Sequence, residues 1–178
     1  MFEFEKTYLA KYLPKDLTNF PHAEIVDIYY PKTAKHPVLR LRRIGEKIEL
    51  TKKQPVNGGD SSHQEEQTIA LSAEEFQELA RLEGKRLRKI RYYYPYQGKT
   101  AEVDVYQDGL AGLVAVDVEF ESYDEMEGFE MPEFCLYEVT QEKLIAAGML
   151  AGKSYIDIQK GLEQFGYIKI TLEEGEQR

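Results

Sequence analysis

The sequence contains no tryptophan and a single cysteine, Cys135. One cysteine excludes an intrachain disulfide and any metal site built from several thiolates. Because no His/Cys constellation accompanies Cys135, we interpret it as a small apolar core residue rather than a nucleophile. No apolar run approaches the roughly 18 residues of a membrane span. The opening residues alternate charged and apolar side chains, unlike a signal peptide, so we expect a cytoplasmic protein.

Basic residues are fewer than acidic ones. The 178 residues include 23 Lys and Arg against 32 Asp and Glu, which gives a formal net charge of -9. A generic nucleic-acid-binding protein needs a net basic face, so this composition argues against that class, although a local basic patch inside an acidic shell is compatible with it. Hydrophobic residues at 42% and charged residues at 31% are typical of a folded chain, and the length predicts a single domain over 1–178.

Most of the sequence alternates polar and apolar residues with the period of two that is typical of β-strands. A polar, turn-rich loop at 55–62 interrupts the pattern. The alternation predicts strands over 2–9, 24–30, 38–44, 47–53, 63–71, 85–94, 99–107 and 113–122.

Helical patterns are fewer. The segment 72–84 begins with Ser72 as N-cap and has Glu75 three residues later, which is a capping box. Further helices are predicted over 122–129 and 140–150, with a weaker pattern over 155–165. Hairpin-linked strands with few helices predict a mainly antiparallel sheet closed into a barrel, with the helices packed outside.

The alternation repeatedly separates charged from apolar side chains. Glu3 and Glu5 share one face of their predicted strand, while Phe2 and Phe4 share the other. The same spacing groups Arg40 with Arg42, Lys89 with Arg91, Glu102 with Asp104, and Asp117 with Glu119. For any one strand, a solvent-exposed face explains this pattern. Over several strands, the separation into cationic and anionic pairs also fits a site for an anion and a divalent metal, because basic groups bind phosphate oxygens and carboxylates bind hard cations.

Taken in order, these pairs resemble the CYTH domains of the triphosphate tunnel metalloenzymes. The resemblance covers about residues 3–155 and leaves 156–178 as a C-terminal extension. It is carried by "EFEKT" at the start for Glu-x-Glu-x-Lys, Arg40 and Arg42, Thr51 and Lys53, "HQEEQ" at 63–67, Lys89 and Arg91, Glu102 and Asp104, Asp117 to Phe120, and "EVT" at 138–140.

The resemblance implies an eight-stranded antiparallel tunnel with a charged interior, in a metal-dependent enzyme that acts on a triphosphate. It implies that Mg²⁺ or Mn²⁺ is held by Glu3, Glu5, Asp117 and Glu119. It implies that the triphosphate is bound by Arg40, Arg42, Lys53, Lys89 and Arg91. Glu65, Glu102 and Asp104 are implied as further interior acids, in catalytic roles that place the attacking water or hold a basic neighbour. Lys52 is an alternative to Lys53, because the register of this strand rests on analogy.

Three positions depart from the family pattern. Thr7 stands where the opening signature has a lysine, and His63 and Gln67 stand where the third motif has an arginine and a second glutamate. Lys6 is adjacent to position 7 but should point outward if Glu5 points inward. The loss of one interior lysine and one glutamate could be a compensated exchange that nearly keeps the net charge of the tunnel. It could also mark reduced catalysis or a changed substrate. Since the metal-binding acids and most bases are retained, we favour an active enzyme.

The leading hypothesis is therefore a metal-dependent hydrolase of inorganic tripolyphosphate or of a small organic triphosphate such as thiamine triphosphate. An adenylyl cyclase of the same family is the enzymatic alternative, although no adenine-recognition motif is evident. A non-catalytic polyphosphate- or nucleotide-binding module is the alternative from another class, motivated by Thr7 and Gln67. We expect no membrane partner, and the oligomeric state stays open.

Overall fold

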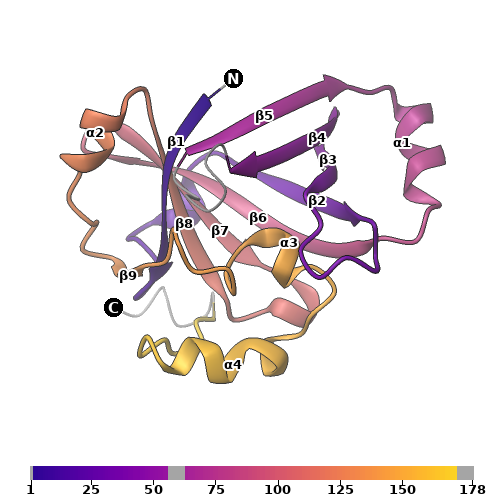
Figure 1. The fold of residues 1–178 in the computed structure, drawn as a ribbon. Coiled ribbons are helices and arrows are strands. Elements are labelled where there is room, and N and C mark those ends of the chain that lie inside the picture. The colour runs from indigo at the N-terminus through magenta and orange to yellow at the C-terminus, as the bar shows by residue number, and fades with distance from the viewer. Residues whose placement is uncertain (1, 56–62, 172–178) are drawn as a thin grey trace.

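The computed structural model describes residues 2–55 and 63–171, without the side chains of residues 2, 3, 55, 63 and 64. Its main element is one antiparallel sheet (Figure 1). The strands are β1 (Phe2–Ala10), β2 (His22–Tyr30), β3 (Leu39–Ile44), β4 (Lys47–Pro55), β5 (His63–Ala70), β6 (Lys85–Tyr96), β7 (Lys99–Tyr106), β8 (Val114–Phe120) and β9 (Cys135–Glu138). The predicted mainly antiparallel sheet is confirmed, and β9 is a strand that the sequence pattern did not indicate.

The strand order is β5-β4-β3-β2-β6-β7-β8-β1-β9, so most hairpins join neighbours in the sheet. The N-terminal strand pairs with strands from the later part of the chain. β1 lies between β8 and β9, with Glu5 opposite Glu119 and Thr7 opposite Asp117. The start of β1 also pairs with β5, with the backbone of Phe2 opposite that of Glu65. β5, at one end of this strand order, therefore also pairs with β1, which lies next to β9 at the other end.

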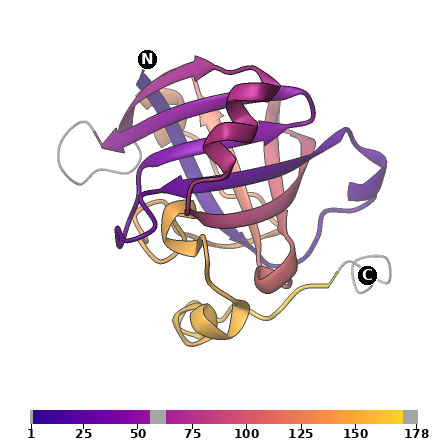
Figure 2. The same cartoon turned by 90° about the vertical axis from the view of Figure 1, so that its right-hand side faces the viewer.

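The helices pack against the outside and one end of the curved sheet (Figure 2). They are α1 (Ala73–Ala80), α2 (Tyr123–Glu127), α3 (Ala147–Leu150) and α4 (Tyr155–Glu163), with short 3-10 turns at Leu17–Asn19 and Asp108–Leu110. The capping box predicted for α1 is confirmed, because Ser72 Oγ accepts from the Glu75 amide while the Glu75 carboxylate accepts from the Ser72 amide.

The helix predicted over 140–150 is wrong for most of its length. Residues 140–146 form successive turns, and only α3 is helical. Tertiary contacts at both ends explain the difference. At the start of the segment, the Val139 amide donates a hydrogen bond to the Thr7 carbonyl. At its end, Gly148 packs closely on the loop between β2 and β3, where a Cβ atom would lie 2.5 Å from the Pro37 carbonyl oxygen. These tertiary contacts override the local helix propensity of the segment.

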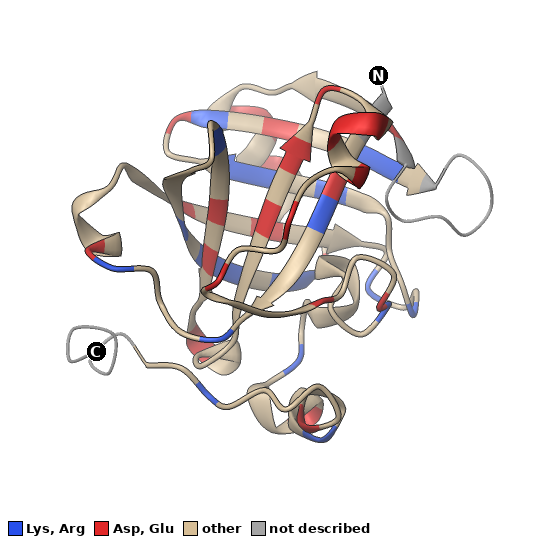
Figure 3. Ribbon diagram, turned by 90° about the vertical axis from the view of Figure 1, so that its left-hand side faces the viewer, with Lys and Arg blue, Asp and Glu red and all other residues tan. Residues whose placement is uncertain are grey.

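Apolar side chains cover the outer face of the sheet. Val103, Val116 and Val118, from β7 and β8, are completely buried and pack with Tyr8 of β1. A second group, around Ile28, Leu41 and Ile48, lies under α1. Charged residues alternate with these apolar ones along the strands (Figure 3), and the period of two places them on the opposite face.

A third apolar cluster lies where the sheet meets α3 and α4. It includes Leu113 and Ala115 beside Leu150, Ile158 and Leu162. The apolar core therefore lies at the outer face and at this end of the sheet. The charged face is not part of that core. In the part of the chain that the structure describes, no helix is both long and apolar enough to cross a membrane.

Tyr167 fastens the segment after α4 to the sheet. Its buried hydroxyl donates to the Gly112 carbonyl at 2.9 Å and accepts from the Val114 amide at 2.7 Å. We expect Tyr167→Phe to lower the free energy of unfolding by about 1–3 kcal/mol, because two buried backbone groups lose their partner. Urea unfolding measures this. The exposed Tyr137 provides the control: Tyr137→Phe should change stability by less than about 0.5 kcal/mol, and equal effects would contradict the assignment.

Candidate active site

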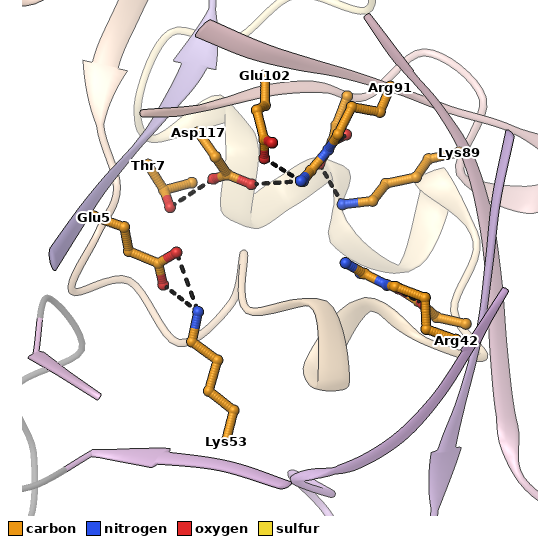
Figure 4. Close-up of polar contacts among 10 residues, drawn as sticks. Glu5, Thr7, Arg42, Lys53, Lys89, Arg91, Glu102 and Asp117 are labelled. Atoms are coloured by element: carbon orange, nitrogen blue, oxygen red, sulfur yellow. Dashed lines mark hydrogen bonds and ion pairs between the residues drawn. The ribbon is translucent and has the colours of Figure 1, made fainter. Parts of the chain in front are cut away.

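The charged face encloses a cavity of about 520 Å³. Among the described residues, the charged side chains that line it are evenly divided between the two signs. The basic ones are Arg40, Arg42, Lys47, Lys53, Lys89, Arg91 and Lys143, and the acidic ones are Glu5, Glu49, Glu66, Glu102, Asp117, Glu119 and Glu142. Figure 4 labels eight residues of this site, which come from β1, β3, β4, β6, β7 and β8 and point toward a common interior.

Arg42 is held by a buried carboxylate that the sequence reasoning missed. Its Nε and Nη2 donate to Asp27 Oδ1 and Oδ2, each at 2.6 Å. Asp27 lies directly opposite Arg42 on β2 and is completely buried. Burial alone would raise the pKa of Asp27, but the guanidinium outweighs it and lowers that pKa. The pair therefore fixes Arg42 as a charged group with a defined orientation.

Lys89 and Arg91 share a second buried carboxylate, Asp104 of β7. Arg91 donates to Asp104 Oδ1 through Nε at 2.7 Å and to Oδ2 through Nη2 at 2.6 Å, and Lys89 Nζ contacts Oδ2. Asp104 is 1% exposed. Burial would raise its pKa, but Arg91 and Lys89 lower the pKa to about 2. Asp104 thus lies behind the cavity wall and holds two bases that face the cavity.

Arg91 also bridges two acids on the cavity surface. It contacts Glu102 through Nη1 and donates to Asp117 Oδ2 through Nη2 at 3.1 Å. Glu102 and Asp117 lie directly opposite each other on β7 and β8. Burial raises the pKa of Glu102 to about 7, and the nearby acids add to this while Arg91 opposes it. Like charges placed directly opposite are unfavourable in a sheet, so Arg91 makes this pair possible.

A second pair of opposed acids lies beside the first. Glu5 of β1 faces Glu119 of β8. Lys53 Nζ donates to both oxygens of Glu5, at 3.1 and 3.2 Å, and the exposed Glu119 also lines the cavity. Lys52, the alternative to Lys53, is exposed and does not line the cavity. The structure therefore brings Lys53 to the predicted site.

On β5 the predicted face is wrong. Glu65 was expected inside, but it is exposed and absent from the cavity lining, whereas its neighbour Glu66 lines the cavity. The cause is the pairing with β4, where Glu66 lies opposite Lys53 and Gln67 lies opposite Lys52. Because directly opposed residues project from the same face, Gln67 is turned away from the cavity. The glutamine noted as a departure from the family pattern therefore removes no interior acid.

The remaining predicted residues divide into three cases. Arg40 lines the cavity, and its Nε is buried without a hydrogen-bond partner among the described residues. Lys6 points away from the cavity, as expected, and lies 3.8 Å from the Glu138 carboxylate of β9. The side chains of Glu3 and His63 lie outside the described residues, although the backbone of Glu3 pairs with Gln64.

Several cavity residues were not predicted. Besides Glu66, they include Tyr29 and Tyr106 in the wall and Lys143 in the turns before α3. Asp27, also unpredicted, lies behind the wall and holds Arg42. Asp27 and Tyr29 share their face with the apolar Ile25, so that face of β2 gave no charged pattern. The pairing of β2 with β3 would have indicated both residues, because Asp27 lies opposite Arg42 and Tyr29 lies opposite Arg40.

The donor chemistry of the acidic strands fits a hard divalent cation. Glu5, Asp117 and Glu119 offer only carboxylate oxygens, the ligands that Mg²⁺ and Mn²⁺ prefer, and the opposed Glu5 and Glu119 favour a cation between them. Among the side chains that the structure describes, which exclude those of Glu3 and His63, no three acidic, histidine or cysteine groups already converge on one point. These carboxylates would have to turn toward a shared ion.

The chain is similar in sequence to the inorganic triphosphatase of Nitrosomonas europaea. The two are 36% identical over 107 residues, which is 59% of this chain and 68% of the relative. A scan against protein-family models gives no match.

Solved structures share the fold. The inorganic triphosphatase NE1496 aligns with a TM-score of 0.61 and 27% identity, over 85% of this chain and 95% of its own. A putative adenylate cyclase from Bacillus halodurans aligns with a TM-score of 0.53 at 13% identity, over 95% and 92% of the two chains, which is a likeness of fold alone. The antiparallel sheet with its charged face and the similarity to these proteins lead to the same family. The chain belongs to the CYTH family of triphosphate tunnel metalloenzymes.

The buried Arg42–Asp27 pair gives a test of the site's framework. We expect Asp27→Asn to lower the free energy of unfolding by about 3–5 kcal/mol, because it leaves a buried guanidinium without a countercharge. The folded-state pKa of Asp27 lies below its usual value of 3.8. Its contribution is therefore complete above that value and is lost as the pH falls through the folded-state pKa.

Urea unfolding at pH 7 and at pH 3 measures both effects. The wild type should lose more stability between these pH values than Asp27→Asn does. The exposed Asp124 gives the control: Asp124→Asn should follow the wild type at both pH values. An Asp27→Asn protein with wild-type stability and acid sensitivity would contradict the role of the pair.

Proposed function

We propose that this protein hydrolyses inorganic triphosphate with the help of a divalent metal, inside a tunnel formed by its sheet. The observation that carries the proposal is a cavity that, among the described residues, is lined by seven basic and seven acidic side chains. Those on β3 and β6 are basic, and those on β7 and β8 are acidic. The sequence relative named an inorganic triphosphatase supports the choice of substrate. A triphosphate carries several negative charges and needs a cationic enclosure, whereas a metal needs oxygen ligands.

Closure of the sheet into an eight-stranded tunnel is part of this proposal. The pairing of β1 with β5 supports it, since these two strands join the ends of the eight-strand order while β9 remains outside it. The side-chain directions in Figure 4 support it too, because residues from β1, β3, β4, β6, β7 and β8 face a common space. A tunnel would surround the substrate and limit the access of water to the bound phosphates.

The substrate would be bound mainly by Arg40, Arg42, Lys53, Lys89 and Arg91. Arginine suits phosphate because its planar fork forms two parallel hydrogen bonds. Arg42 and Arg91 are oriented by Asp27 and Asp104 before any ligand arrives. Such preorganised cations lower the cost of stabilising charge as it develops on the transferred phosphoryl group.

The carboxylates divide into two groups. Glu3 and Glu5 of β1 would hold Mg²⁺ or Mn²⁺ together with Asp117 and Glu119 of β8. When bound, such an ion neutralises phosphate charge and activates or orients water. Glu102 and Asp104 would act on the basic side, where they hold Arg91 and Lys89 in position. Lys53 would exchange Glu5 for a phosphate oxygen when metal and substrate bind together.

A substrate panel tests the activity. The protein is incubated with tripolyphosphate, thiamine triphosphate and ATP, each with Mg²⁺ or Mn²⁺, and we expect phosphate release from tripolyphosphate. Cyclic AMP formation from ATP would point to a cyclase instead. Thermal stabilisation by all three compounds without turnover would identify a binding module and overturn the hydrolase.

The metal site has its own test. Glu5→Gln and Glu119→Gln should each reduce metal-dependent turnover by about 100-fold or more, because loss of a ligand weakens the metal's charge stabilisation by several kcal/mol. Thermal unfolding should confirm that both variants fold. Glu46→Gln, in the exposed turn between β3 and β4, is the matched control and should retain full turnover. Full activity in both Glu5→Gln and Glu119→Gln would show that the metal site is misplaced.

Arg40 gives a test of the cationic side. Because its Nε is buried without a described partner, Arg40→Lys should raise the KM for tripolyphosphate by about 10–100-fold, the loss expected for one charge-assisted hydrogen bond. The neighbouring Arg43 lies on the other face, over the Phe76 ring at 5.5 Å. Arg43→Lys should therefore leave KM unchanged. Equal KM values for the two variants would remove Arg40 from the binding site.

A further inference from the structure

Thr7 makes a side-chain contact inside the cavity that its sequence position alone did not explain. Its Oγ1 donates a hydrogen bond of 2.8 Å to Asp117 Oδ1. The two residues lie directly opposite each other on β1 and β8, and both line the cavity (Figure 4). The position that departs from the family signature is therefore occupied by a side chain with a defined partner.

The backbone of Thr7 is fixed independently of this contact. Its amide donates to Thr140 Oγ1 at 3.1 Å, and its carbonyl accepts from the Val139 amide at 2.7 Å. These bonds attach β1 to the segment that follows β9. Because they use only backbone atoms of Thr7, a change of its side chain removes the contact to Asp117 without removing them.

Asp117 is then held from two sides. Thr7 occupies a site on Oδ1, and Arg91 Nη2 donates to Oδ2 at 3.1 Å. A carboxylate has about four lone-pair sites, so two remain for another partner. The rotation of the carboxylate is restricted, and its free lone pairs have a set direction beside Glu5 and Glu119. Hydrogen bonds of this kind orient metal-ligating carboxylates and raise affinity for the ion.

We propose that Thr7 is a positioning residue that orients Asp117 for a divalent cation, and that it does so without adding a charge. This inference rests on the proposed metal-dependent function. A lysine at position 7 would reach the same carboxylate as an ammonium group and would compete with the cation for it. A threonine hydroxyl supplies the hydrogen bond and leaves the negative charge of Asp117 to the ion. Thr7 therefore sets cation affinity, and the departure from the signature is a functional exchange.

The test measures Mn²⁺ binding to the chelator-treated protein by calorimetry, with no triphosphate present. Thr7→Val keeps the shape and removes the hydroxyl, and we expect about 10- to 100-fold weaker binding. Thr7→Ser keeps the hydroxyl and should bind Mn²⁺ within about threefold of the wild type. Thr7→Lys should weaken binding at least as much as Thr7→Val. The control is Thr100→Val, an exposed position on β7, which should leave affinity unchanged.

Each result has a defined reading. Wild-type affinity in Thr7→Val, or an equal loss in Thr7→Ser and Thr7→Val, would overturn the role of the hydroxyl while the proposed function stands. A wild-type protein that neither binds Mn²⁺ nor hydrolyses tripolyphosphate would overturn the proposed function itself. Thermal unfolding checks that each variant folds. If Thr7→Val does not fold, Thr7→Ala removes the same hydroxyl with a smaller side chain and carries the same expectation.

Discussion

The structure depends on the neutralisation of charges that its strands direct inward. A cation taken out of water costs several kcal/mol unless a partner of opposite sign and good geometry accompanies it. Here Asp27 supports Arg42, and Asp104 supports both Lys89 and Arg91. These acids lie deeper than the bases, at 0% and 1% exposure. The framework therefore fixes the cations from behind and leaves their other sides toward the cavity, where an anion can bind.

This arrangement determines where the hydrophobic core lies. Because the inner face is committed to charge, apolar burial moves to the outer face, under α1 and α2 and against the loop that leads to β9. It also gathers at the end closed by α3 and α4. The helices α1, α2 and α4 thus add hydrophobic free energy from outside the cavity, whereas Ala147 and Gly148 of α3 form part of its lining.

Much of this was predictable from period-two alternation. Every predicted strand exists, and on β3, β7 and β8 one face is mostly apolar, so the direction of the charges follows from it. On β5 the sequence "HQEEQT" has polar residues on both faces, so only pairing with β4 reveals that Glu66, not Glu65, faces inward. Asp27 was missed because its face also carries Ile25. The turns at 140–146 depend on contacts with β1 and Pro37, which local propensity does not contain.

On β7 and β8, one face carries charges of the cavity and the other packs in the apolar core, so a shift of register within a strand affects both. An insertion of one residue within a strand such as β8 would exchange Asp117 and Glu119 with Val116 and Val118, burying carboxylates in the outer core and emptying the site in one step. Length changes in this lineage should therefore collect in the connections between strands, while substitutions inside the cavity proceed one side chain at a time. Thr7 illustrates the second kind: the chemistry at one inner position differs from the family signature, while Thr7 still lies opposite Asp117 and Glu5 still lies opposite Glu119.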